Sequence, residues 1–247
     1  MKIVGEIMKQ LIYYMSVLIL ISSCKNNPTD PPIIEKGVSK DLAVIRKNQI
    51  SAVNYQLKFN IPFERENAIK SELIMTAEIH DISVPLILDF KEDKNALSQV
   101  LVNEVEIPIE HMNEHLIISS DNLNLGKNRV EVLFTAGELS INRNEDYLYT
   151  LLVPDRSRTL FPCFDQPDIK ASYELTISAP KDWKVLCSSP LESEIENGEF
   201  REHQFLKSVP MSSYLFSFVV GDFKIEEKDL GDDKMNILYR ETNHDKI

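Results

Sequence analysis

Two histidines and a glutamate stand at a spacing that could bind a metal ion. In His111-Met-Asn-Glu-His115, imidazoles at positions i and i+4 flank Glu114, which matches the pattern H-x-x-E-H of a helical zinc site. The pattern needs a helix, because there residues i and i+4 share one face. Apolar segments at 107–109 and 116–118 leave no room for such a helix. We therefore interpret His111, Glu114 and His115 as part of a turn between strands, and we predict no metal ligand and no catalytic residue in this chain.

A second unusual stretch is the loop at 154–167, between alternating segments at 147–153 and 171–178 that are typical of strands. Its prolines fix φ near −65° and disfavour helix, so we expect a rigid, non-helical connection. These prolines are Pro154, Pro162 and Pro167. Phe161 and Phe164 flank Cys163 and predict a buried apolar plug. By residue chemistry alone, the loop is a packing device at the corner of a β domain.

The same loop carries a family resemblance. Arg158-Thr-Leu-Phe-Pro-Cys-Phe-Asp-Gln-Pro167, followed by Lys170-Ala171, resembles the signature A-R-R-x-F-P-C-x-D-E-P…K-A of the aminopeptidase N family of zinc exopeptidases. Further similar blocks, at 53–57, 182–186 and 210–223, follow in the family's order, so the resemblance covers about residues 40–247. The matching residues, which we interpret as a structural loop, are Arg158, Phe161, Pro162, Cys163, Asp165, Gln166 and Pro167.

The resemblance implies an N-terminal β domain that stops before the catalytic machinery. Members of the family hold zinc with H-E-x-x-H and a distant Glu and bind the substrate's amine with a G-x-M-E-type motif, and none of these motifs is present. Zinc is therefore expected in a full-length enzyme and not in this chain. The expected partners are a catalytic zinc domain and, through it, peptide substrates. The alternatives are a stand-alone β binding module that lost catalysis and, more remotely, a metalloprotease built on His111 and His115.

One position of the substrate cleft can be carried over from the resemblance. Relatives have Thr-Gln where this chain has Thr150-Leu151, and their Gln lines the pocket around the substrate's first residue. Leucine cannot form hydrogen bonds with its side chain, so Leu151 is expected to form a cleft wall that offers apolar contact alone.

Composition bounds the other classes of function. The chain has 247 residues, 43% hydrophobic residues and a formal net charge of −12. This length allows one sizeable core, and the acidity provides no basic surface for a phosphate backbone, so we expect no nucleic-acid partner.

The first 24 residues have the features of a lipoprotein signal peptide. Lys2 and Lys9 precede an apolar run at 11–21, and small residues precede Cys24, as in a bacterial lipobox. We expect Cys24 to carry lipid and to anchor an exported chain to a bilayer on the periplasmic or cell-surface side. Cys163 and Cys187 remain, and we expect free thiols, with a disulfide as the alternative.

The elements that position these residues are strands. Residues 25–48 are predicted to form a tether and one short helix that Ser39 caps, and residues 49–247 a β domain. From residue 51 onward the hydrophobic period is two, with almost no helical period. In the alternating run at 53–61, Tyr55, Leu57 and Phe59 are expected on the buried face, and turns are predicted at 121–126 and 142–145. The other predicted strands are 73–80, 84–90, 99–107, 116–120, 129–135, 183–187, 199–206, 214–223 and 235–240. The predicted fold class is therefore all-β, and the resemblance sharpens it to the saddle-like, twisted multi-sheet domain found at the start of aminopeptidase N relatives.

Overall fold

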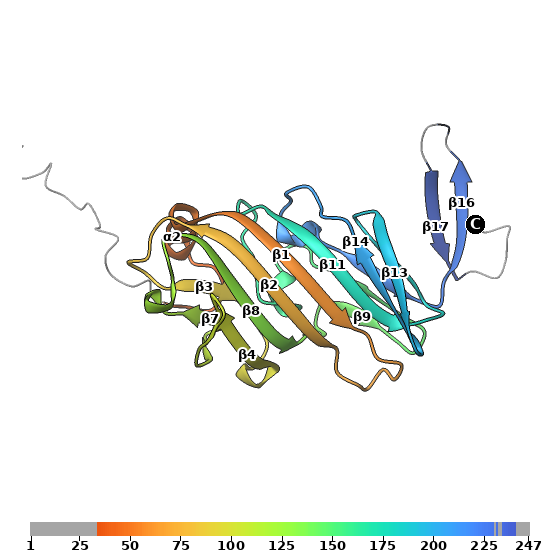
Figure 1. Cartoon of the computed structure of the whole chain (residues 1–247), viewed down its shortest axis with the longest axis horizontal. Coiled ribbons are helices and arrows are strands. Elements are labelled where there is room, and N and C mark those ends of the chain that lie inside the picture. The colour runs from red at the N-terminus through yellow and green to blue at the C-terminus, as the bar shows by residue number, and fades with distance from the viewer. Residues whose placement is uncertain (1–33, 230, 232–233, 241–247) are drawn as a thin grey trace, which may run out of the picture. The chain divides into compact units, whose positions relative to one another are not determined.

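The computed structural model describes residues 34–229, 231 and 234–240, which all belong to one compact unit, residues 32–247 (Figure 1). The predicted leader, Cys24 and most of the predicted tether lie outside the described residues. Strands dominate the described residues, which include a single α-helix, so the all-β prediction is confirmed. That helix, α2 (Lys40–Gln49), begins at Ser39, whose side chain accepts a hydrogen bond from Leu42 N at 3.2 Å, as predicted.

Eight strands form the largest sheet, in the order β13-β14-β11-β1-β2-β8-β4-β5 (Figure 1). They are β1 (Ile50–Asn60), β2 (Lys70–Ile79), β4 (Leu97–Val102), β5 (Val105–Glu106), β8 (Gly126–Thr135), β11 (Ala171–Pro180), β13 (Leu191–Asn197) and β14 (Phe200–Phe205). At the centre, β1 pairs in parallel with β11 and antiparallel with β2. A parallel pair requires a long connection. The loop at 154–167 is the last part of that connection before β11.

Smaller sheets complete the architecture. A four-stranded sheet has the order β12-β15-β10-β9, a three-stranded sheet has the order β3-β7-β6, and β16 pairs with β17. Their bounds are β3 (Leu86–Asp89), β6 (Glu110–Met112), β7 (His115–Ile118), β9 (Ile141–Arg143), β10 (Tyr147–Thr150), β12 (Lys184–Cys187), β15 (Phe218–Gly221), β16 (Lys224–Asp229) and β17 (Lys234–Tyr239).

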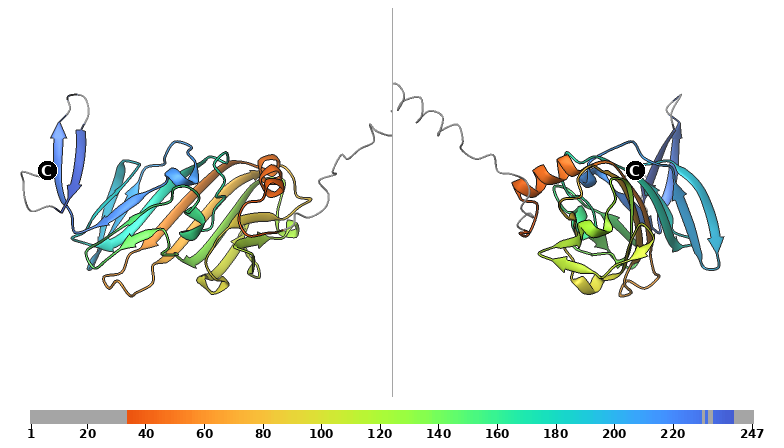
Figure 2. Two further views of the ribbon diagram at one scale, coloured as in Figure 1. Left: turned by 180° about the vertical axis from the view of Figure 1, so that it is seen from behind. Right: turned by 60° about the vertical axis from the view of Figure 1, so that its left-hand side comes forward.

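The hydrophobic core lies where the two larger of these small sheets meet the eight-stranded sheet (Figure 2). Phe59 of β1 contacts Phe218 of β15, with ring centroids 5.1 Å apart, and it also contacts Phe134 of β8. Phe134 in turn contacts Phe90, which follows β3. The alternation along β1 therefore sends its aromatic side chains into the core and its polar side chains to the opposite face of the sheet.

The structure differs from the predicted strands in several places, chiefly where a strand does not alternate buried and exposed residues. Strand β13 was not predicted, because it is an edge strand whose side chains are mostly exposed and carry no alternation. Residues 142–145 were predicted as a turn, but β9 includes Asn142 and Arg143. The predicted strand at 214–223 instead contains a 3₁₀ turn, Ser213–Leu215, before β15 begins. Helix α2 also belongs to the same compact unit as the sheets, and not to a separate tether.

Candidate functional site

The histidine motif forms a β-hairpin and not a helix. His111 lies on β6, His115 lies on β7, and Met112 pairs with His115 across the hairpin. Asn113 and Glu114 make the turn, with φ of 50° and 69°. The ring of His111 donates from Nε2 to the carbonyl oxygen of Phe90 at 2.8 Å, since that oxygen can only accept. The two imidazoles therefore do not share the face that a helical zinc site requires.

His115 forms hydrogen bonds that connect the start of the described chain to this hairpin. Its side chain is fully buried, and Nε2 donates to the carbonyl oxygens of Glu35 at 2.8 Å and Gly37 at 3.1 Å. The side chain of Asn113 donates to the carbonyl oxygen of Ile34 at 2.8 Å. We call residues 34–37 the N-terminal strap. Because Nε2 of both histidines faces a carbonyl, neither offers that lone pair to a metal ion, and no group of three or more His, Cys, Asp or Glu among the described residues is arranged to hold one.

A buried ion pair lies beside the strap. Arg46 of α2 donates from Nη2 to Asp89 Oδ1 at 2.6 Å and from Nη1 to Oδ2 at 2.8 Å, and both side chains are fully buried. Arg46 also donates to the carbonyl oxygen of Ile87. His115 Nδ1 lies 2.9 Å from Asp89 Oδ1, although an N–H there would not point at this oxygen, so the contact is close without being a well-directed hydrogen bond.

Opposing effects act on the pKa of Asp89. Burial, the largest effect, would raise the pKa, but the charge of Arg46, the close imidazole of His115, and the hydrogen bonds from Arg46 and the backbone N–H of Asp165 outweigh it. The pKa of Asp89 is therefore lowered below its ordinary value, which keeps the carboxylate charged beside Arg46.

The family-signature loop forms several hydrogen bonds with Asp89. The backbones of Cys163 and Asp89 exchange hydrogen bonds of 2.7 and 3.0 Å, and Asp165 N donates to Asp89 Oδ2 at 2.8 Å. Asp165 accepts from Ser213 Oγ at 2.8 Å and from Arg158 N at 3.2 Å. Burial raises the pKa of Asp165, although those hydrogen bonds oppose the shift.

The remaining signature residues close the corner. Phe161 packs edge-on against Tyr55 and Phe216, while the guanidinium of Arg46 lies over the ring of Phe164. The other signature contacts are Gln166 Nε2 to the carbonyl oxygen of Ala43 at 3.1 Å, and Ser212 Oγ to that of Pro167 at 2.6 Å. The expectation of a non-helical loop was wrong over one turn, because Ser157–Thr159 form a 3₁₀ helix between the prolines.

The thiols of this domain are not activated. Cys163 and Cys187 are both free, and burial raises the pKa of each. Since the thiolate is the nucleophile, neither residue has the features of a catalytic cysteine.

Leu151 lies outside the signature loop, three residues before its start. It follows β10, its side chain is 55% exposed, and its N–H donates to the carbonyl oxygen of Ser140 at 2.8 Å. The preceding Thr150 is buried, and its Oγ1 accepts from Phe218 N at 3.1 Å. The exposed position of Leu151 is compatible with a cleft wall, and that role stays a prediction.

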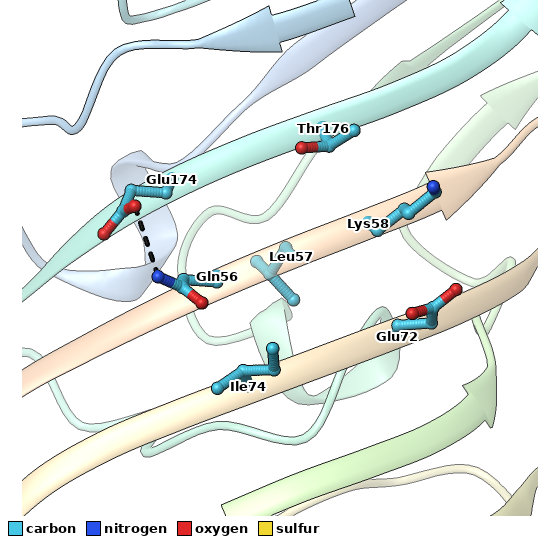
Figure 3. A pocket seen from close by; sticks show the side chains of 7 residues that line it. All are labelled: Gln56, Leu57, Lys58, Glu72, Ile74, Glu174 and Thr176. Atoms are coloured by element: carbon cyan, nitrogen blue, oxygen red, sulfur yellow. Dashed lines mark hydrogen bonds between the residues drawn. The ribbon is translucent and has the colours of Figure 1, made fainter. Parts of the chain in front are cut away.

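A shallow hollow of about 240 Å³ lies on the polar face of the large sheet (Figure 3). Gln56 donates to Glu174 at 3.3 Å, and Lys58 pairs with Glu202 at 2.6 Å. The polar residues that line the hollow are Gln56, Lys58, Glu72, Glu174 and Thr176. Within the described residues, no hydrogen bond joins the Thr176 hydroxyl to either carboxylate, so the hydroxyl lacks the adjacent base that would activate it as a nucleophile.

Sequence reasoning missed Arg46 and Asp89, and it gave His115 no partner. A signal existed, because Arg46 interrupts the apolar face of the predicted helix and Asp89 ends an apolar strand. Two opposite charges that each break an apolar pattern indicate a buried pair.

The fold and this corner define a multi-sheet β domain whose most distinctive residues are structural. The chain belongs to the family described as the peptidase M1 N-terminal domain, whose model matches residues 51–215. The resemblance to aminopeptidase N relatives is thereby confirmed.

Curated relatives match one part of the chain. Glutamyl aminopeptidase of Rattus norvegicus is 35% identical over 91 residues, which cover 36% of this chain and 10% of the relative. Glutamyl aminopeptidase of Sus scrofa is 44% identical over 71 residues, covering 28% and 8%. Aminopeptidase M1 of Arabidopsis thaliana is 35% identical over 83 residues, covering 34% and 9%. The chain thus spans about a tenth or less of these relatives.

Solved structures agree on the fold. The M1 zinc metallopeptidase of Deinococcus radiodurans superposes with a TM-score of 0.61 at 15% identity, over 76% of this chain and 46% of that one. A two-domain M1 zinc metallopeptidase variant bound to L-arginine gives a TM-score of 0.62 at 16% identity. At this identity the likeness establishes the fold alone.

Proposed function

We propose that this chain acts as the N-terminal β domain of a lipid-anchored zinc aminopeptidase and is not a peptidase by itself. The observation that carries the proposal is the family match over residues 51–215, in which the signature loop is fixed by the Arg46–Asp89 pair. Zinc would be held by a catalytic domain, because His111 and His115, the two histidines at a metal-binding spacing, donate to backbone carbonyls.

The contribution of the domain would be a rigid wall. The signature loop is held by backbone and side-chain bonds to Asp89 and by aromatic packing around Phe161, so its position depends little on solvent. Leu151 extends from this framework with an exposed apolar side chain. In the proposed assembly, Leu151 gives apolar contact to the first residue of a peptide substrate and leaves recognition of the amine to the catalytic domain.

The test of this proposal is an activity assay with and without a catalytic partner. The purified chain with added zinc should not cleave aminoacyl-p-nitroanilides, and a downstream reading frame that encodes H-E-x-x-H should supply the missing activity when the two are coexpressed. Turnover by the chain alone that survives chromatography and is blocked by a chelator would overturn the proposal. An unrelated downstream gene, with no activity on coexpression, would favour a stand-alone binding module.

The anchoring part of the proposal concerns residues outside the described structure. Its support is the sequence pattern that ends at Cys24. Among the helices that the structure describes, none is long and apolar enough to cross a membrane. Metabolic labelling with a clickable fatty acid should mark the wild-type chain and not the Cys24→Ala variant. Absence of label on the wild type, or label that persists on the variant, would remove the anchor.

A further inference from the structure

A hollow of about 320 Å³ opens beside the signature loop, and we call it the corner hollow. Its lining residues are Lys91, Leu139, Asp155, Arg156, Arg158 and Thr159. The backbone N–H of Lys91 donates to the carbonyl oxygen of Arg158 at 2.8 Å, so two of the cations come from adjacent, hydrogen-bonded backbone. The position of the hollow is therefore set by the same framework that fixes the loop.

The charged side chains that line the corner hollow are mainly positive, although the chain as a whole is negatively charged. Three cations and one acid line the hollow, whereas the whole chain has a formal net charge of −12. In the described part of the chain, the side chains of Lys91 and Arg156 form no hydrogen bond and no ion pair, although the charge of Lys91 acts on the carboxyl group of the neighbouring Glu92. An acidic protein with unpaired cations gathered in one hollow has a local preference for anions.

Arg158 has hydrogen-bonding capacity left over. Its Nη2 lies 3.4 Å from Asp155 Oδ2, and its Nη1 lies 3.7 Å from Glu114 Oε2. Charge-assisted hydrogen bonds are usually about 2.7–2.9 Å long, so both contacts are loose. The Nε of Arg158 is buried and has no acceptor. The two loosely paired Nη groups could therefore donate to an incoming carboxylate, whereas the buried Nε is out of its reach.

An apolar side chain, that of Leu139, lines the hollow and is 66% exposed. A free inorganic anion would leave this side chain in water. A polypeptide could cover it while presenting an acid to the cations.

We propose that the corner hollow binds the carboxylate of an acidic side chain in another polypeptide segment, with a neighbouring apolar residue of that segment covering Leu139. The hollow consists of residues of this chain alone. The site goes beyond the proposed function and does not require a catalytic domain.

The test is a titration of the purified full chain, followed by the Nε–Hε signals of its arginines in proton–nitrogen NMR spectra. The probe is acetyl-Leu-Glu-Leu-amide, and the matched control probe is acetyl-Leu-Gln-Leu-amide. We expect a saturable shift of the Arg158 signal with the glutamate peptide and binding about tenfold weaker with the glutamine peptide, the scale of one charge-assisted hydrogen bond. Binding should also weaken as salt is added.

Matched variants complete the experiment. The double variant Lys91→Gln, Arg156→Gln should bind the glutamate peptide about tenfold more weakly than wild type, because each substitution removes a positive charge from the hollow. Lys127→Gln with Lys181→Gln changes the net charge equally at exposed positions elsewhere and should leave affinity unchanged. Equal weakening by both pairs, equal binding of the two peptides, or tighter binding of inorganic phosphate than of the glutamate peptide would overturn the proposal.

Discussion

Arg46 on helix α2 and Asp89 at the end of β3 form a bidentate ion pair from which water is excluded, at 2.6 and 2.8 Å. Asp89 also accepts from Asp165 N, so one carboxylate joins the helix, the three-stranded sheet and the signature loop. The stability of the corner therefore depends on two residues that stand outside the family signature.

Replacing Arg46 with methionine should be strongly destabilising. The change leaves the Asp89 charge buried without its partner, and loss of one partner of a buried pair costs about 3–5 kcal/mol. Guanidinium denaturation measures the free energy of unfolding. As control, Lys47→Met removes a cation one residue away whose pair with Asp168 is 69% and 51% exposed, and it should cost under about 1 kcal/mol. Equal costs for the two variants would contradict the role given to Arg46.

The two acids of the corner should respond to pH in opposite directions. The folded pKa of Asp89 is lowered, so its ionisation contributes stability that is present above its unfolded pKa, about 3.9, and is lost as the pH falls through the folded value. The folded pKa of Asp165 is raised, so its ionisation costs stability as the pH rises through about 3.9 and the folded value.

Unfolding measured from pH 7 to pH 3 separates these effects. The deficit in unfolding free energy of Asp89→Asn relative to wild type should be largest at pH 7. It should shrink as the pH falls below about 3.9, where the unfolded state takes up the proton first, and on through the lower folded pKa of Asp89. Asp165→Asn should show the reverse trend. Its free energy of unfolding, relative to that of the wild type, should be lower at pH 3 than at pH 7. Parallel pH profiles for the two variants would show that these shifts are not as described.

The N-terminal strap should open more often when the hairpin turn loses its amide. Asn113→Gly preserves a residue that tolerates positive φ but removes the 2.8 Å hydrogen bond to the carbonyl oxygen of Ile34. Loss of about 1 kcal/mol should raise the rate of tryptic cleavage after Lys36 by about fivefold. Glu104→Gly, at φ 70° in another turn, is the matched control and should leave that rate unchanged. Cleavage that is equally fast in both variants would mean that Asn113 does not hold the strap.

A methyl group at Gly137 should displace the signature loop. A Cβ there would lie 2.0 Å from the carbonyl oxygen of Thr159 and 2.3 Å from Glu92 Oε1, so backbone must move. We expect Gly137→Ala to cost about 3 kcal/mol or more, at the upper end for overpacking, and to speed tryptic cleavage after Arg156. Gly198→Ala, with open space but φ of +65°, should cost roughly 1–2 kcal/mol and leave cleavage at Arg156 unchanged. A smaller cost at Gly137 than at Gly198 would argue against close backbone packing.

Local sequence was sufficient for much of the fold. The alternation of Tyr55, Leu57 and Phe59 with polar residues predicted β1 and its buried face, and Ser39 predicted the start of α2. The prolines and aromatic residues of the loop predicted a packed corner, and its motif identified the family. These features depend on neighbours in the chain, through backbone sterics, capping and the two-residue period of a strand.

Tertiary structure decided which charges became buried and which strands met. Tyr55 and Tyr173 pair in a parallel register although 110–120 residues separate β1 from β11, and no local period encodes that register. The histidine motif could be read as a turn from its flanks, but the use of His115 to hold residues 34–37 depends on segments about 80 residues apart. Likewise, the cations of the corner hollow are ordinary surface residues in the sequence, and only the packing of the loop against Lys91 brings them to one place.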